Sequence, residues 1–277
     1  MRLLTWNVQW FRGLDGVVDV ARVIAHARAL ADVDVLCLQE VAQHYPALAG
    51  GAGFDQVAQL QTLLPGFALF YGAAVDEPGP DGRRQRFGNL IATRLPAEHL
   101  RHLSLPWPPD PGVRSMPRLC TSLTVRSPFG PLRVMTTHLE YDSALQRRAQ
   151  ADALARLHAE ASAHAANPLP PGAEAGTPFQ DKPHTASAVL CGDFNSGPGS
   201  PEHAALQAAR LVDAWPLAHP GQAHAPTFRL YDKRYGKTPV ACDGFFVSED
   251  LAPRVRRVEV DEKTQLSDHQ PVILELG

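Results

Sequence analysis

Residues 188–195 read AVLCGDFN, and this stretch decides how the rest of the chain is interpreted. A short apolar run ends at Gly192, and Asp193 and Asn195 follow it directly. An apolar run of this length between turn formers is typical of a strand that is buried on both faces. Polar side chains just past such a strand stand where a rigid scaffold presents its chemistry. The stretch therefore predicts a buried sheet with a functional site at the ends of its strands.

The same arrangement recurs at four other places in the chain. Asn7 follows the apolar residues 3–6, Gln39 and Glu40 follow 35–38, His138 follows 134–137, and Asp268 and His269 precede 271–274. Taken singly, each of these residues also suits a turn, a cap or a surface position. Coincidence at all five places is much harder to accept. Carboxylates, amides and histidines, without a serine or cysteine in a matching place, suit a hard cation and a phosphate rather than acyl transfer.

Composition limits the partners of the chain. Its 277 residues are 44% hydrophobic and 20% charged, which is ordinary globular composition and excludes disorder, collagen and coiled coil. Lys plus Arg number 26 and Asp plus Glu number 29, so the formal net charge is −3. The net charge of the chain therefore does not favour binding of a long polyanion, although a local basic groove could still bind one.

The cysteines and the apolar runs bear on where the protein acts. Cys37, Cys120, Cys191 and Cys242 lie far apart and form neither a redox pair nor a zinc motif, so we expect small buried core residues. Two disulfides are the alternative, but nothing points to secretion. No apolar run approaches the ~18 residues that span a bilayer. We expect a cytoplasmic protein without membrane insertion and without an obligate protein partner.

Hydrophobic periodicity predicts many short strands and a few helices. The expected strands are 3–8, 34–38, 68–72, 89–93, 120–126, 132–137, 188–191, 244–247 and 271–276, and the expected helices are 19–31, 54–64 and 143–163. In the last helix we expect Leu145, Ala149, Ala153, Leu154 and Leu157 to form the buried stripe. Segments 76–86, 106–117 and 167–187 are predicted loops. The third resembles a linker, but strands on both sides of it carry residues of one site. We therefore interpret 167–187 as a loop insertion and 1–277 as a single domain.

The ordered motifs resemble those of a known family. TWN (5–7), LQE (38–40), THL (137–139), GDFN (192–195) and SDH (267–269) are similar to the motifs of the endonuclease/exonuclease/phosphatase superfamily of Mg²⁺-dependent phosphoesterases. They span nearly the whole chain in the order of that family. The resemblance implies an α+β fold, the deoxyribonuclease-I-like four-layer αββα sandwich, in which two mixed β-sheets pack face to face with helices outside.

The resemblance also implies a role for each site residue. It makes Glu40 the principal ligand of Mg²⁺, for which Mn²⁺ would substitute, and it places Asn7 and Asp268 beside the ion, directly or through its waters. Asp193 would orient and deprotonate the attacking water, while Asn195 would hold Asp193 and a phosphate oxygen. His138 and His269 would donate to the non-bridging oxygens, and Asp243 would orient His269. Family members often carry an arginine and an aromatic residue where this chain has Ala241 and Gly244, which leaves the local substrate contacts open.

Basic and aromatic residues in the loops are the candidates for substrate contact. They are Arg83, Arg84, Arg86, Arg114, Arg118, Arg229, Lys233, Arg234, Lys237, Trp107, Phe228, Tyr231 and Tyr235. We expect a metal-dependent hydrolase of a phosphodiester substrate, with DNA and RNA among the candidates. A phosphomonoesterase of a small metabolite or lipid headgroup is the alternative. A non-catalytic phosphate-binding module is disfavoured, because Glu40, Asp193, Asn195 and His269 are all intact.

Overall fold

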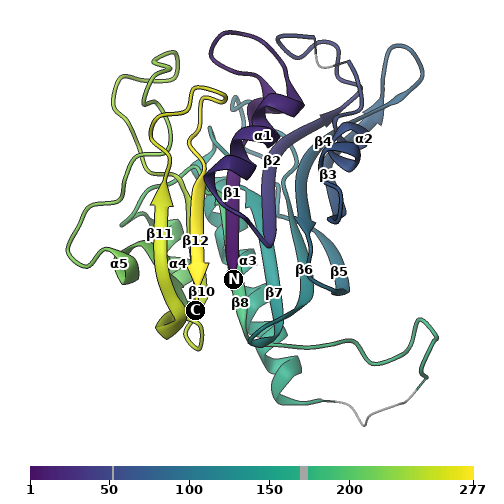
Figure 1. The fold of residues 1–277 in the computed structure, drawn as a ribbon, viewed down its shortest axis with the longest axis vertical. Helices are drawn as coiled ribbons and strands as arrows, with labels where there is room; N and C mark the ends of the chain where they lie inside the picture. The colour runs from purple at the N-terminus through teal and green to yellow at the C-terminus, as the bar shows by residue number, and fades with distance from the viewer. Residues whose placement is uncertain (52, 169–173) are drawn as a thin grey trace.

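Two six-stranded sheets form the centre of the molecule (Figure 1). The structure is a computed structural model and describes residues 1–51, 53–168 and 174–277. The first sheet has the order β11 (Val255–Val260), β12 (Val272–Leu276), β1 (Arg2–Asn7), β2 (Val35–Gln43), β4 (Arg84–Thr93) and β3 (Ala68–Pro78). The second has the order β5 (Ala97–Ser104), β6 (Leu119–Ser127), β7 (Gly130–His138), β8 (Ala188–Asp193), β10 (Asp243–Ser248) and β9 (Leu211–Asp213).

Both sheets are mixed. In the first sheet β1 and β2 run parallel, and in the second β7 and β8 do, whereas the other neighbours are antiparallel. The carboxyl ends of a parallel pair lie at the same edge of a sheet. Each sheet therefore brings the polar residues that follow two strands to one edge.

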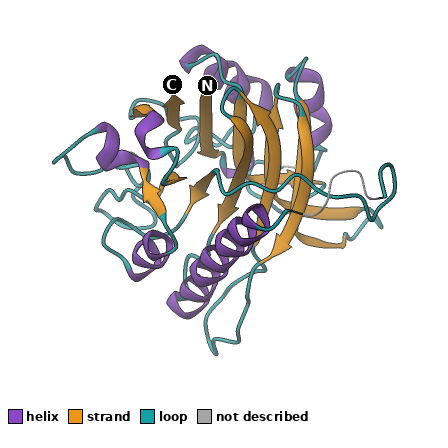
Figure 2. Ribbon diagram, turned by 90° about the horizontal axis from the view of Figure 1, so that it is seen from below, coloured by secondary structure: helices purple, strands orange, loops and turns teal. Residues whose placement is uncertain are grey.

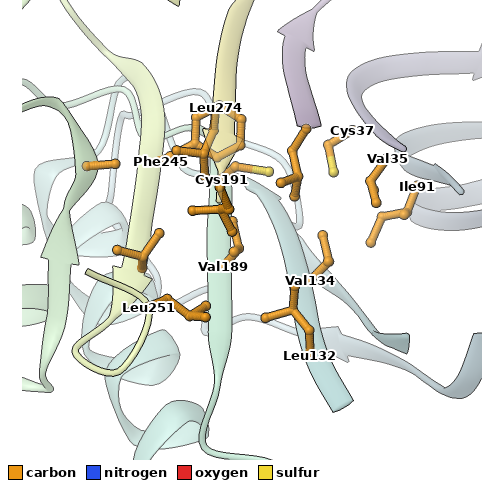
Figure 3. Close-up of a cluster of buried hydrophobic side chains, with 14 of the residues drawn as sticks. Val35, Cys37, Ile91, Leu132, Val134, Val189, Cys191, Phe245, Leu251 and Leu274 are labelled. Atoms are coloured by element: carbon orange, nitrogen blue, oxygen red, sulfur yellow. The ribbon is translucent and has the colours of Figure 1, made fainter. Parts of the chain in front are cut away.

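The central strands are apolar on both faces because each face meets a different layer. Cys37 of β2 and Cys191 of β8 belong to the core between the two sheets, together with Val134 of β7 (Figure 3). Their neighbours in sequence point the other way: Leu36 packs in the core under the helices of the first sheet, and Leu190 packs in the core under those of the second. For this reason continuous apolar runs, and not alternating ones, mark these strands.

Helices cover the outer faces of the two sheets (Figure 2). The first sheet is covered by α1 (Val20–Leu30) and α2 (Gln56–Leu63), and the second by α3 (Ala144–Ala166) and α4 (Pro201–Ala208). The smaller helical elements are α5 (Ala214–Ala218), η1 (Gln9–Phe11) and η2 (Ala252–Arg254). The predicted αββα sandwich is confirmed. In the part of the chain that the structure describes, no helix combines the length and apolar character that crossing a bilayer requires.

Side-chain caps determine where the helices begin. Asp19, Asp55, Ser143 and Ser200 each accept a hydrogen bond from a backbone N–H of the first turn of α1, α2, α3 and α4. Such a cap satisfies one of the N–H groups that have no partner within the helix. Three of these helices therefore start within two residues of the predicted positions.

One sequence prediction about local structure is wrong, and a second is confirmed only in part. Segment 76–86 is a β-hairpin, because β3 continues to Pro78 and β4 starts at Arg84. In α3, the predicted Ala153 and Leu154 are buried, and Leu157 packs against the same core. Leu145, however, is 54% exposed, and the amides Gln146 and Gln150 extend the buried stripe in its place. Their Nε2 groups donate to the carbonyls of Pro108 and Pro106, so α3 anchors the proline-rich segment through polar contacts. Hydrophobic periodicity does not reveal a stripe of this kind.

The remaining loops and the cysteines agree with the sequence more closely. Segment 106–117 contains neither helix nor strand. Of the predicted 167–187 loop, residues 169–173 lie outside the described part of the chain, and residues 174–187 form turns without a helix or strand. The four cysteines are free and buried, as expected for core residues. The pattern missed β5, β9, β11, α4 and α5, which are short or mostly exposed elements.

Candidate active site

The two parallel strand pairs end at a common edge of the sandwich. Asn7 at the end of β1 lies opposite Gln39 of β2, and His138 at the end of β7 lies opposite Asp193 of β8. The buried Gln39 side chain joins the two sheets below this edge. Its Nε2 donates to Thr5 Oγ1 of the first sheet at 3.1 Å and to Thr136 Oγ1 of the second at 2.9 Å.

Asp193 occupies the centre of the site. Its Oδ2 accepts a hydrogen bond from Asn7 Nδ2 at 3.0 Å, and the same amide donates to Glu40 Oε1 at 3.1 Å. His138 Nε2 lies 3.4 Å and His269 Nε2 lies 3.7 Å from that Asp193 oxygen. One buried carboxylate thus contacts an amide from the first sheet and lies between two imidazoles.

Asn195 holds Asp193 through its backbone, while its side chain makes a different contact. Its backbone N–H donates to Asp193 Oδ1 at 2.9 Å, whereas its side-chain Nδ2 donates to the carbonyl of Leu139 at 2.9 Å. The side chain therefore ties this turn to the end of β7. Gly192 makes the approach possible, because its φ is +135° and an added Cβ would lie 1.9 Å from the Thr137 carbonyl oxygen.

Glu40, Asp268 and Asn7 offer oxygen ligands next to Asp193. Burial, followed by the nearby Asp268 carboxylate, raises the pKa of Glu40 to about 7. Burial also raises the pKa of Asp268, against the effect of His269. Carboxylates that crowd in this way are stabilised by a cation among them, and hard oxygen ligands favour Mg²⁺ or Mn²⁺. The donor set therefore fits a divalent metal.

The two histidines of the site, His138 and His269, differ in charge. Burial, followed by the positive charge of Arg118, lowers the pKa of His138 to about 3, so this imidazole is neutral at pH 7. Burial also opposes the charged form of His269, but Asp243 and Asp193 outweigh it and hold the pKa of His269 well above its usual range. His269 Nδ1 donates to Asp243 Oδ2 at 2.9 Å. One neutral and one charged imidazole therefore face Asp193.

Thr227 fixes the carboxylate that holds His269. Its Oγ1 donates to Asp243 Oδ2 at 2.6 Å and accepts from the Asp243 backbone N–H at 3.1 Å. Phe228 stacks on the His269 ring with centroids 4.3 Å apart and planes inclined by 15°. Ligand atoms of Asp193, Cys242, Asp243 and His269 lie within 4.8 Å of one another, a grouping that could hold a metal, although hydrogen bonds inside it already occupy Asp243 and His269.

A cavity of about 150 Å³ opens above these residues. Trp10, Arg118, Tyr141, Phe228 and Tyr235 line it together with the site residues. Arg118 is buried, and its Nε donates to Glu140 Oε2 at 3.1 Å. Its Nη1 has no hydrogen-bond partner among the residues that the structure describes. The cavity thus presents an arginine donor and an aromatic rim.

Most other candidates for substrate contact are engaged elsewhere. Arg83, Arg84 and Arg234 pair with Asp81, Asp76 and Asp232, while Trp107 donates to Ser115 and Tyr231 to the Glu262 carbonyl. Arg229 contacts the rim, where its Nη2 donates to the Tyr141 hydroxyl at 3.2 Å.

Sequence reasoning missed several neighbours of the site. Gln9 Nε2 donates to Asp268 Oδ2 at 2.7 Å, and Gln9 and Trp10 both have positive φ angles. Their position in the sequence, one residue beyond TWN, was the available signal. Thr227 and Tyr141 lie outside the motifs, and nothing in the pattern marks them.

Comparison with known proteins agrees with this geometry. The Endonuclease/Exonuclease/phosphatase family matches residues 4–169 and 175–269. No curated protein matches the chain. Among solved structures, an endonuclease/exonuclease/phosphatase from Beutenbergia cavernae DSM 12333 is 25% identical with a TM-score of 0.68, over 100% of this chain and 72% of that one.

Two further solved structures share the fold. A mannosyl-6-phosphatase from Bacteroides thetaiotaomicron VPI-5482 is 18% identical with a TM-score of 0.70, over 100% of this chain and 99% of that one. A 3′ phosphatase from Neisseria, bound to a product DNA hairpin, is 22% identical with a TM-score of 0.61, also over 100% of this chain and 99% of that one.

Proposed function

The chain belongs to the Endonuclease/Exonuclease/phosphatase family, and from this premise we propose that it hydrolyses phosphodiesters with a divalent metal and a water molecule activated by Asp193. Enzymes of this family are phosphoesterase hydrolases that use divalent metals. The observation that carries the proposal is the surroundings of Asp193 Oδ2, which lies within 3.0 Å of Asn7 Nδ2 and within 3.7 Å of a ring nitrogen on each of two histidines.

Glu40, Asp268 and Asn7 are the residues that we expect to hold the metal. A bound Mg²⁺, or Mn²⁺ in its place, would supply positive charge that neutralises the phosphoryl oxygens. Gln9 orients Asp268 through the hydrogen bond of 2.7 Å. We prefer this set to the group around Cys242, since it offers only the oxygen ligands that Mg²⁺ favours.

The chain's own residues account for the proton and the charge of the reaction. Asp193 accepts a proton from water as the water oxygen attacks phosphorus, and the bond from phosphorus to the leaving oxygen breaks, with the electron pair of that bond staying on the leaving oxygen, which then takes a proton from solvent. The charged His269 donates from Nε2 to a non-bridging oxygen, and Asp243 keeps it charged and oriented. His138, which is neutral, donates from one ring nitrogen only. Donors placed where charge develops are often the largest contribution to such catalysis.

A phosphomonoesterase is the second candidate, and the size of the cavity favours it. A volume of about 150 Å³ suits a single phosphoryl group with a small substituent. Two proteins of the same fold are named as phosphatases, one for a mannose phosphate and one for a DNA 3′ end. In either case the guanidinium of Arg118, which lines the cavity, is the positive charge that we expect to attract the phosphate.

One screen distinguishes these possibilities. Bis-p-nitrophenyl phosphate, p-nitrophenyl phosphate and plasmid DNA are incubated with the protein in Mg²⁺ and, separately, in excess EDTA. We expect Mg²⁺-dependent release of nitrophenol from the diester, and loss of this activity in Asp193→Asn. Faster turnover of the monoester would favour the phosphatase, and nicking of the plasmid would favour a nuclease. Full activity in EDTA contradicts the metal-dependent mechanism, and no turnover of any substrate favours a binding module.

A further inference from the structure

A second cavity lies on the outer face of the second sheet, away from the catalytic residues. Its volume is about 250 Å³. Its walls come from the outer face of β5, β6 and β7, the last turns of α3, and residues 183–185. It shares no lining residue with the catalytic cavity among the residues described.

Strand geometry separates the two cavities. Arg133 and His138 both lie on β7, five residues apart, which corresponds to about 16 Å along an extended strand. Successive side chains alternate between faces, so Arg133 and His138 point to opposite sides of the sheet. Arg133 shares the outer face with Met135, which packs under α3.

Two arginines and three histidines line this cavity. The nitrogen bases that line it are His99, Arg101, Arg133, His164 and His184. Within the described part of the chain, no aspartate or glutamate lines it. His164 and His184 stack with centroids 4.7 Å apart and planes inclined by 15°. Arg101 and Arg133 carry the permanent positive charge of this lining, and burial lowers the pKa of His99 and so favours its neutral form.

Arg133 is the buried centre of the group. Its side chain is only 8% exposed, and its Nε has no hydrogen-bond partner among the described residues. Its Nη2 donates to Nδ1 of His158 at 2.6 Å, so this histidine acts as an acceptor and is neutral. Arg133 forms no ion pair with a described carboxylate, although a buried charge without a partner is strongly destabilising.

An anion in the cavity would supply the opposite charge that the Arg133 guanidinium lacks. Guanidinium groups bind phosphate oxygens through two parallel hydrogen bonds, and Arg101 of β5 lines the same cavity, with β6 between its strand and β7. The hydroxyls of Ser122 and Thr124 offer further hydrogen bonds. A cavity of about 250 Å³ exceeds the needs of a bare phosphate and is small for a dinucleotide.

We propose that the cavity formed by Arg101, Arg133, His99, His164 and His184 is a second site, which binds the phosphate group of a small phosphorylated molecule or free phosphate. Binding there does not depend on the metal of the catalytic site. The proposal therefore stands apart from the proposed function and is tested without turnover.

Calorimetric titration of the whole protein with inorganic phosphate in excess EDTA provides the test. Without metal, Glu40, Asp193 and Asp268 make the catalytic cavity unfavourable for phosphate. We expect one molar equivalent to bind with a Kd of about 1 mM or tighter. Arg101→Gln should weaken binding roughly tenfold, as loss of one charge-assisted hydrogen bond predicts, and Arg133→Met should abolish it. Arg101 is exposed, so its variant keeps the test valid if Arg133→Met does not fold.

Two controls locate the binding. Arg156→Gln removes an exposed arginine of α3 that does not line the cavity, and Arg118→Gln removes the arginine of the catalytic cavity. Both should leave the Kd unchanged. No saturation up to roughly 10 mM, or equal weakening by Arg156→Gln and Arg101→Gln, overturns the proposal. So does binding that falls in Arg118→Gln but not in Arg101→Gln.

A parallel titration distinguishes the two sources of phosphate. Tighter binding of ribose 5-phosphate than of inorganic phosphate would identify a phosphorylated metabolite as the ligand. Equal affinities would identify free phosphate. Binding of a single-stranded oligonucleotide without binding of either small phosphate would contradict the proposal and indicate a nucleic-acid surface.

Discussion

The hydrogen bond between His269 and Asp243 makes a quantitative prediction. Asp243→Asn preserves the shape of the side chain but removes the charge that His269 Nδ1 contacts at 2.9 Å. Hydrogen bonds to charged groups contribute about 1.5–3 kcal/mol, so kcat should fall roughly 10-fold to 150-fold. His269→Ala removes the donor itself and should cost on the order of 10²–10⁴ in kcat, as loss of an oxyanion donor does. Both residues are buried, so solvent cannot replace either one.

The double variant tests whether the two residues act as one unit. If Asp243 acts only through His269, the double variant should be little worse than His269→Ala, and the two losses should not add. The assay is kcat and kcat/KM on one diester substrate in saturating Mg²⁺. Asp261→Asn is the matched control, because it breaks a second carboxylate–histidine pair, Asp261 with His26 at 2.8 Å, outside the site. Additive losses for Asp243 and His269 would show that Asp243 does not act through His269.

The pH profile gives an independent readout of the same pair. Asp243 and Asp193 overcome the effect of burial and raise the pKa of His269, so the charged form persists until the pH rises through that raised value. Asp243→Asn lowers this pKa, so the alkaline limb of kcat/KM should move to lower pH. A limb that does not move would show that Asp243 acts in some other way.

Four further predictions concern the metal, the turn, the core and the domain. Glu40→Gln should raise the Mg²⁺ concentration for half-maximal activity about tenfold, because affinity for hard cations follows ligand charge, whereas the exposed Glu262→Gln should leave that titration unchanged. Gly192→Ala should lower the free energy of unfolding, measured in urea, by about 3 kcal/mol or more, because the added Cβ would collide with the Thr137 carbonyl oxygen. A loss within experimental error would contradict the close approach of the two backbones at Gly192. Leu154→Ala, in the core under α3, should lower the free energy of unfolding by about 2–5 kcal/mol. The exposed Leu145→Ala should lower it by about 0.5 kcal/mol or less. Equal losses in the two variants would contradict this orientation of α3. Calorimetry should show one unfolding transition for residues 1–277, and two separated transitions would refute a single domain.

The sequence predicted the centre of the fold well because its central strands are buried on both faces. Runs such as 35–38 and 188–191 are apolar throughout, and short runs of this kind between turn formers are typical of doubly covered strands. The edge of the second sheet escaped prediction, since β5 reads AEHLRHLS and is mostly exposed. The hairpin between β3 and β4 also escaped, because its strands continue through charged residues that pair across it, as Asp76 does with Arg86.

The motif residues of the site could be predicted from the sequence, but the residues that hold them in place could not. Residues at the ends of buried strands, such as Asn7 and Asp193, do meet in space as the pattern indicated. Thr227 was not predictable, because its contact with Asp243 depends on how a loop of irregular sequence folds back. The role of Arg133 was not predictable either. Only the structure shows that this arginine pairs with none of the described carboxylates.

The division of the site between two sheets constrains how this protein can evolve. Asn7, Glu40 and Asp268 belong to the first sheet and its connections, while His138 and Asp193 end strands of the second. The separation of the two sets is therefore set by the thickness of the hydrophobic layer between them, where Cys37 and Cys191 pack. A mutation that adds or removes a methyl group in that layer changes the reacting geometry as well as the stability. Selection for turnover therefore also constrains residues of the buried core, and substitutions that change substrate preference are expected mainly in the loops.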